Sequence, residues 1–120
     1  MNSEEIRDVV VEALEDLKGI DVKVLDVHGK TSVTDILVIA SGNSGRQIRA
    51  LANNVQEMVK ERGITPLSSE GTHDSGWMLI DLGDVVVHVM LPATRDFYNL
   101  EKLWGEEAPD AENESDDENG

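Results

Sequence analysis

Residues 75–104, SGWMLIDLGDVVVHVMLPATRDFYNLEKLW, carry the strongest structural pattern in the chain. Its residues 77–82 and 85–91 are rich in β-branched and apolar side chains, and only Gly83 and Asp84 separate them. Two strand-like runs joined by a two-residue connection that begins with glycine are typical of a β-hairpin. The sequence therefore predicts a hairpin here, and the hairpin is expected to form the centre of the fold.

The register of this hairpin divides its side chains between two faces. With Gly83 and Asp84 in the turn, Leu82 lies opposite Val85, and opposed residues of neighbouring strands point to the same side of a sheet. One face is then wholly apolar, whereas the other combines aromatic, aliphatic, acidic and imidazole groups. We call this second set the mixed hairpin face: Trp77, Leu79, Asp81, Val86, His88 and Met90. All of its members except Val86 are predicted to be partner-binding residues.

Length and composition fit one small domain. The 120 residues suffice for a single hydrophobic core. No apolar run approaches the roughly 20 residues of a membrane helix, and MNSEEIRDVV lacks the basic and apolar segments of a secretion signal, so we expect a cytoplasmic protein. The absence of cysteine excludes disulfides, cysteine nucleophiles and cysteine-ligated metal sites.

The charge distribution is strongly acidic. A formal charge of -15 argues against electrostatic capture of nucleic acid and favours a basic protein as partner. Residues 105–120, GEEAPDAENESDDENG, contain many acids, no base and no large apolar side chain. Such a segment cannot bury enough surface to fold. We expect a folded domain over residues 1–104 and a disordered acidic tail over residues 105–120.

The first half of the chain alternates helical and strand patterns. Apolar residues recur at helical spacing over residues 6–17 and again over residues 48–59. The first run starts where Asn2 or Ser3 can cap, with Glu5 three residues after Asn2. Residues 34–40, TDILVIA, are nearly all apolar, which predicts an interior strand buried on both faces. A weaker alternating strand is expected over residues 21–27.

The second half completes the predicted order α-β-β-α-β-β-β-α. A short strand is expected at residues 64–67, followed by a polar loop at residues 68–76 and then by the hairpin. After the hairpin, Thr94 is the expected cap of one last helix. One side of this helix would carry Phe97, Leu100, Leu103 and Trp104.

Two patterns raise the question of catalysis. SGNSG, residues 41–45, lies between a strand and a helix but lacks the lysine and spacing of a P-loop, so a turn with a Ser44 cap is favoured over a phosphate site. Asp81 and Asp84 point in different directions and do not form a magnesium-binding pair on one strand face. A histidine in a strand, such as His88, is more often a hydrogen-bonded packing residue than a catalytic one. A cluster of His88 with Asp81 and Asp35 stays open as an alternative.

Several motifs lie in a characteristic order along residues 3–104. They are a Thr-Asp pair followed by LVIASGNSGRQIRALA, a Glu-Gly pair ahead of a tryptophan, WMLIDLGDVVVHVM, and finally Arg95 with the Phe-Tyr, Leu-Glu and Trp of the last helix. The chain resembles the ribosomal silencing factor family, RsfS, also called Iojap-like. It departs from the family at Ile36, where members usually carry an aromatic residue, and in its long acidic tail.

The resemblance implies an α/β (α+β) domain with a mixed β-sheet flanked by helices, similar in outline to nucleotidyltransferases but without their activity. It implies binding to ribosomal protein fourteen of the large ribosomal subunit, which sterically blocks the small subunit and represses translation under nutrient limitation. No enzyme activity and no cofactor are expected. Two alternatives stay open: a nucleotidyltransferase-like enzyme acting through Asp81 and His88 near residues 41–44, and a dimerising scaffold without a ribosomal role. Pairing through the mixed hairpin face would make the free protein a homodimer.

Overall fold

The computed structural model describes residues 2–30 and 34–104, with the backbone alone at residues 72, 73, 103 and 104. The expected acidic tail lies outside the described residues. The elements, in chain order, are α1 (Ser3–Asp16), β1 (Ile20–Asp26), β2 (Ile36–Ser41), α2 (Gly45–Glu61), β3 (Ser68–Thr72), the 3-10 turn η1 (His73–Ser75), β4 (Trp77–Asp81), β5 (Val85–Met90), α3 (Pro92–Tyr98) and α4 (Leu100–Trp104).

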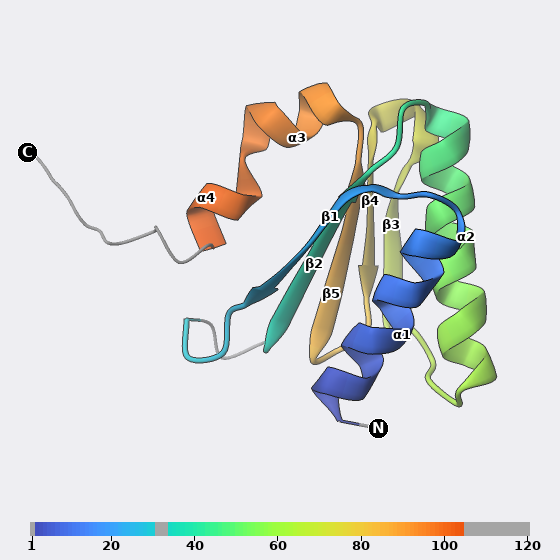
Figure 1. Cartoon of the computed structure of the whole chain (residues 1–120), viewed down its shortest axis with the longest axis vertical. Helices are drawn as coiled ribbons and strands as arrows, with labels where there is room; N and C mark the ends of the chain where they lie inside the picture. The colour runs from blue at the N-terminus through green and yellow to red at the C-terminus, as the bar shows by residue number, and fades with distance from the viewer. Residues whose placement is uncertain (1, 31–33, 105–120) are drawn as a thin grey trace, which may run out of the picture.

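The strands form one five-stranded sheet in the order β1-β2-β5-β4-β3 (Figure 1). β2 and β5 run parallel, and every other neighbouring pair is antiparallel. Helices α1 and α2 cover one face of this sheet, while α3 and α4 lie on the other side. The predicted mixed sheet flanked by helices is therefore confirmed. In the described part of the chain, no helix is long and apolar enough to cross a membrane.

The main core lies between the sheet and the helices α1 and α2. Its fully buried side chains include Val10, Leu14, Leu51, Val55 and Val87. All six residues of β2 are buried, which confirms the prediction of an interior strand. A smaller cluster on the opposite face of the sheet is built around Ile39 and Met90. The sheet thus carries apolar contacts on both sides, because helices cover both.

The hairpin of β4 and β5 has the predicted register. Ile80 pairs with Val87, Met78 pairs with Val89, and the Leu82 N–H donates to the Val85 carbonyl at 2.9 Å. Gly83 adopts φ +91°, a conformation that glycine reaches without steric cost. The apolar face of the hairpin packs into the main core, so the mixed hairpin face points to the side of α3 and α4.

The predicted N-terminal caps of the first two helices, α1 and α2, are confirmed. Asn2 and Glu5 form a reciprocal capping box at the start of α1, with the Glu5 N–H donating to Asn2 Oδ1 at 2.8 Å. The Ser44 side chain accepts from the Gln47 N–H at 3.1 Å at the start of α2. These caps satisfy backbone N–H groups that have no partner within their helix.

The third strand was predicted in the wrong place. Residues 64–67 form no strand, whereas residues 68–72, predicted as part of a polar loop, form β3. β3 is an edge strand that pairs with β4 from Ser68 to Thr72. A strand at the edge is held by backbone hydrogen bonds and needs no buried side chains, so apolar patterning does not reveal it.

The last helix was predicted as continuous, but it breaks at Asn99. This residue takes the left-handed conformation, φ 50° and ψ 54°, and separates α3 from α4. Thr94 is not the cap; Leu91 holds that position without a side-chain bond, and Pro92 begins the helix. Phe97 and Leu100, expected on one side of a single helix, differ in burial, since Phe97 is 80 % exposed and Leu100 is partly buried. The side chains of Leu103 and Trp104 lie outside the described part of the chain.

Candidate partner-binding surface

The five predicted partner-binding residues lie on one face of the hairpin but at different depths. Trp77 pairs with Met90 and Leu79 pairs with His88 across the ladder. Trp77, Leu79 and Asp81 on β4 are partly exposed, whereas His88 is 8 % exposed and Met90 is fully buried. The β4 residues reach the surface, and the two β5 residues lie beneath it. Their binding of a partner stays a prediction.

A hydrogen bond between the two strands orients the Trp77 ring. The indole Nε1–H donates to His88 Nδ1 at 2.9 Å, and the ring centroids lie 5.7 Å apart. Burial lowers the pKa of His88 from 6.5 to about 4. The imidazole is therefore neutral at ordinary pH, and its Nδ1 lone pair accepts the indole proton. This bond leaves the tryptophan with one preferred ring orientation at the surface.

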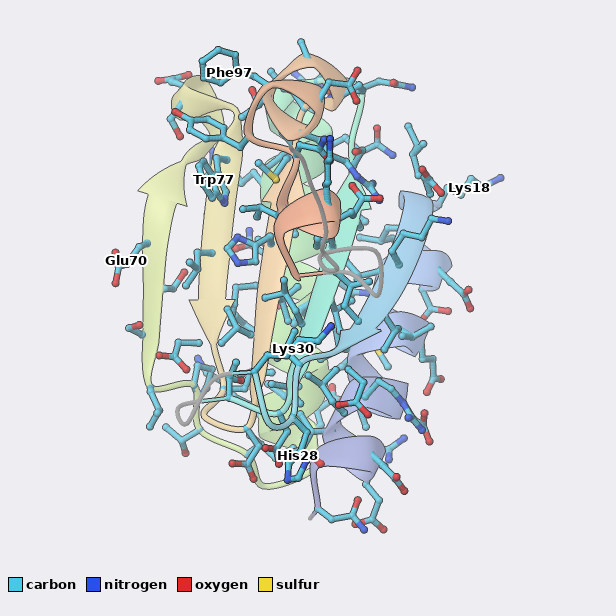
Figure 2. All side chains as sticks on the ribbon, turned by 90° about the vertical axis from the view of Figure 1, so that its left-hand side faces the viewer. Lys18, His28, Lys30, Glu70, Trp77 and Phe97 are labelled. Atoms are coloured by element: carbon cyan, nitrogen blue, oxygen red, sulfur yellow. The ribbon has the colours of Figure 1, made fainter. Side chains whose placement is uncertain are left out.

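Two aromatic residues of α3 extend this surface. The Tyr98 ring lies 4.6 Å from the Trp77 ring, and Phe97 meets Tyr98 edge-on at 5.0 Å between centroids. Tyr98 is 50 % exposed, and Figure 2 shows Phe97 and Trp77 at the same end of the sheet. Neither aromatic residue was predicted to form part of a binding surface. The sequence held no clear signal for this, because adjacent residues of a helix point about 100° apart and can both face one core, as Val9 and Val10 of α1 do.

A groove of about 330 Å³ opens beside these rings. It is lined from β3, the η1 turn, β4 and α3 by Glu70, Gly71, Ser75, Trp77, Leu79, Thr94 and Tyr98. Among these described lining residues, one side chain is acidic and none is basic. We call it the Trp77 groove. Its aromatic wall and acidic rim are suited to a partner that carries both apolar and positive groups.

Arg95 holds α3 in place beside the sheet. It is 6 % exposed, and its guanidinium donates to both carboxylate oxygens of Glu101 at 2.8 and 3.1 Å. It also donates to Ser41 Oγ at 3.0 Å and to the Asp21 carbonyl at 2.8 Å. The hydrogen bonds from Arg95 keep the pKa of the Glu101 carboxyl below its ordinary value, although desolvation opposes this shift. Tyr98, three residues after Arg95, is positioned by this anchor.

The groups of the proposed enzyme alternative are engaged in structural hydrogen bonds. Asp81 accepts the Gly83 N–H in the hairpin turn at 2.9 Å, and His88 accepts the Trp77 indole. Asp35 does not complete a cluster with them, because it lines a separate cavity beside the start of α1. Among the described residues, no group of three histidine or acidic side chains is placed to hold a metal ion.

The SGNSG segment is a helix cap rather than an open cradle for phosphate. The Asn43 N–H donates to Gln47 Oε1 at 2.8 Å, while Ser44 accepts from the Gln47 N–H. The buried Ser41 hydroxyl is bound by Arg95. The groups that would meet a phosphate are thus used to start α2 and to anchor α3.

The comparisons with known proteins agree on one family. The family model described as "Ribosomal silencing factor during starvation" matches residues 1–120. The chain is 52 % identical over 110 residues to ribosomal silencing factor RsfS of Chromobacterium violaceum, which covers 91 % of this chain and 89 % of that protein. Identity to the RsfS of Bacillus subtilis is 41 % over 106 residues, with 88 % and 90 % covered.

A solved structure shares the fold. The crystal structure of a Chromobacterium violaceum protein superposes with a TM-score of 0.85 at 51 % identity and covers 91 % of each chain. The same family is indicated by the sequence motifs, by the mixed sheet and by the match of the family model to residues 1–120. This chain belongs to the ribosomal silencing factor family, RsfS.

Proposed function

We propose that this protein binds the large ribosomal subunit through ribosomal protein fourteen and prevents the small subunit from joining. Its physiological role is then to repress translation in the cytoplasm when nutrients are limited. Family membership supports the ribosomal role. The observation that carries the proposed contact is the partly exposed Trp77, held by His88 and flanked by Tyr98 and acidic groups.

This surface has the composition of a protein-binding site. Tryptophan, tyrosine and arginine dominate the energetics of protein interfaces, and their contribution is largest where the neighbouring contacts exclude water. Trp77 and Leu79 provide apolar area, while Glu70 and Asp81 provide negative charge on the same face of the sheet. A basic ribosomal protein is complementary to such a surface, and the net charge of -15 favours the encounter.

The proposed block is steric. The described part of the molecule measures 47 × 31 × 21 Å. A body of this size at the contact between two subunits holds their surfaces apart, because side-chain rearrangements are far smaller than its shortest dimension. The action requires occupancy alone, with no catalysis and no cofactor. The engagement of Asp81 and His88 within the hairpin supports this proposal over the enzyme alternative.

Subunit joining tests the proposal directly. Purified small and large subunits are mixed with increasing amounts of the protein, without added nucleotide, and the particles are separated by sedimentation. We expect joined particles to decrease in proportion to the bound protein and to stop decreasing once every large subunit carries one copy. Undiminished joining with a saturated large subunit contradicts the steric mechanism. A catalytic, nucleotide-dependent effect would support the enzyme alternative instead.

A further inference from the structure

The Trp77 groove has the size of a single side-chain site. Its volume of about 330 Å³ is near the lower end of the ~300–1,000 Å³ typical of ligand pockets. Residues from two neighbouring strands, one turn and α3 form its walls. The groove therefore fits one large side chain of a partner, or a small ligand of similar size.

Its walls are largely fixed before a partner arrives. The His88 bond orients the indole, and the Arg95 network anchors the helix that carries Tyr98. Gly71 brings β3 close to β4, since a Cβ at this position would lie 2.2 Å from the Trp77 carbonyl oxygen. Binding to such a site costs little conformational entropy, because its ring orientations are already selected.

The chemistry of the lining favours a cation. The faces of tryptophan and tyrosine rings attract positive groups, and a tryptophan gives the strongest such contact. Glu70 is exposed and adds a carboxylate, the Thr94 hydroxyl adds a hydrogen-bond acceptor, and none of the described lining residues is basic. Figure 2 shows Glu70 on the edge strand β3. The labelled Lys18 lies at the opposite edge of the sheet, away from Glu70.

We infer that the Trp77 groove receives an arginine side chain of the protein partner, with the guanidinium against Trp77 and Tyr98 and Glu70 as its counter-charge. Arginine fits better than lysine because its planar group stacks on aromatic rings and is less strongly hydrated. The aliphatic part of the side chain packs on Leu79. This inference rests on the proposed function, since it assigns the chemistry of the partner at the same surface.

A small probe tests the groove without the ribosome. N-acetyl-arginine amide is titrated into the full chain, and the Trp77 indole N–H resonance, assigned with Trp77→Phe, is followed by NMR. N-acetyl-citrulline amide serves as the neutral control of nearly the same shape. We expect the arginine probe to shift the resonance saturably and Glu70→Gln to weaken this binding about threefold or more. Equal shifts with both probes, or none with arginine, overturn the inference.

Binding to purified large subunits provides the second test. We expect Glu70→Gln and Tyr98→Leu each to weaken binding between about threefold and thirtyfold. Glu61→Gln is the matched control, because it removes an equal charge from an exposed position on α2, which covers the other face of the sheet. Normal subunit binding by both groove variants overturns the arginine site but leaves the proposed function intact. If the unmodified protein does not bind large subunits at all, the proposed function fails, and the probe titration still decides the chemistry of the groove.

Discussion

Trp77 is partly exposed, and its indole N–H makes a partly buried hydrogen bond. Its indole N–H is satisfied by His88, so the polar edge of the ring carries no desolvation penalty when a partner covers the rest. Tyr98 supports the ring from α3 at 4.6 Å. This arrangement makes Trp77 the expected anchor of the proposed interface.

Replacing Trp77 by alanine tests that expectation. We expect Trp77→Ala to weaken binding to the large subunit by about 2 kcal/mol or more, because truncated aromatic anchors leave an unfilled site. Leu67→Ser is the control, since Leu67 is 71 % exposed and does not line the groove. Circular dichroism must first show that both variants fold. A folded Trp77→Ala protein with normal binding rules out this anchor.

His88 is predicted to make the stability of the fold depend on pH. Its pKa is lowered to about 4 in the folded state, against 6.5 for a histidine in the unfolded chain. Between these values the unfolded chain binds a proton that the folded chain does not, so this contribution to stability is complete above pH 6.5 and declines as the pH falls toward 4. At pH 5 the loss is about 2 kcal/mol.

His88→Gln removes the titrating group and keeps an acceptor for the indole. We expect the free energy of unfolding of the unmodified protein to fall between pH 7 and pH 5 by about 2 kcal/mol more than that of the variant. Urea denaturation at both pH values measures the difference, and the carboxylates, present in both proteins, cancel. An identical pH dependence in the two proteins would show that His88 is not kept neutral by burial.

At the scale of elements, β3 depends on one glycine. A Cβ at Gly71 would meet the Trp77 carbonyl oxygen at 2.2 Å, and Gly71 has φ +92°. Gly29 has a similar φ of +86°, but a Cβ added there would have nothing within 4 Å. Both alanine substitutions carry the cost of a positive φ, of order 1 kcal/mol. Comparing Gly71→Ala with Gly29→Ala therefore separates the cost of backbone strain, which both variants carry, from the cost of the steric contact, which only Gly71→Ala carries.

We expect Gly71→Ala to lower the free energy of unfolding by about 1–3 kcal/mol more than Gly29→Ala, because the added methyl group forces the edge strand away from β4. Chemical denaturation measures both variants. Hydrogen exchange should also show faster exchange of β3 amides in Gly71→Ala. Equal destabilisation by the two substitutions would mean that β3 shifts to accommodate the methyl group without cost.

The joint between α3 and α4 is held by an ion pair between the buried Arg95 and the partly buried Glu101. Residues six apart on a continuous helix lie on different sides of it, so Arg95 and Glu101 meet only because the chain breaks at Asn99. Arg95 also binds Ser41 and the Asp21 carbonyl, which ties the joint to β1 and β2. The break at Asn99 therefore interrupts the helix but allows Arg95 to bond both Glu101 and the sheet.

Arg95→Met is expected to destabilise the fold by about 2 kcal/mol, since it leaves the hydrogen-bond acceptors around Ser41 and Glu101 without their donor. Lys102→Met, an exposed substitution on α4, is the control and should change stability little. Thermal and urea unfolding measure both. Stability equal to that of the control would show that the network contributes no net free energy, as occurs when desolvation cancels the attraction within a buried ion pair.

At the scale of the whole molecule, the folding unit is expected to end near Trp104. Residues 105–120 contain eight acids, no base and no large apolar side chain. Truncation after Gly105 should therefore leave the melting temperature nearly unchanged, because the removed residues contribute no apolar burial and repel one another. Differential scanning calorimetry of both chains checks this. A large drop would show that the removed segment docks on the domain.

Much of the architecture follows from local patterns. The hairpin register follows from the two-residue connection at Gly83, and the burial of β2 follows from its unbroken apolar run. The caps at Asn2 and Ser44 follow from side chains that satisfy neighbouring backbone groups. Each of these features depends on residues close together in the sequence, and for that reason each could be predicted from the sequence.

The tertiary structure alone decided the remaining features. β3 forms because its backbone groups pair with those of β4. This pairing leaves no apolar pattern in the sequence of β3. The break at Asn99 is accompanied by the contacts of Arg95 with β1 and β2, more than 50 residues earlier in the chain. The sequence pattern placed Trp77 and His88 on one face. In the tertiary structure Trp77 is partly exposed, His88 is buried beneath it, and Trp77 and Tyr98 together line a groove. Depth within a fold depends on what covers each residue, and the covering elements come from distant parts of the chain.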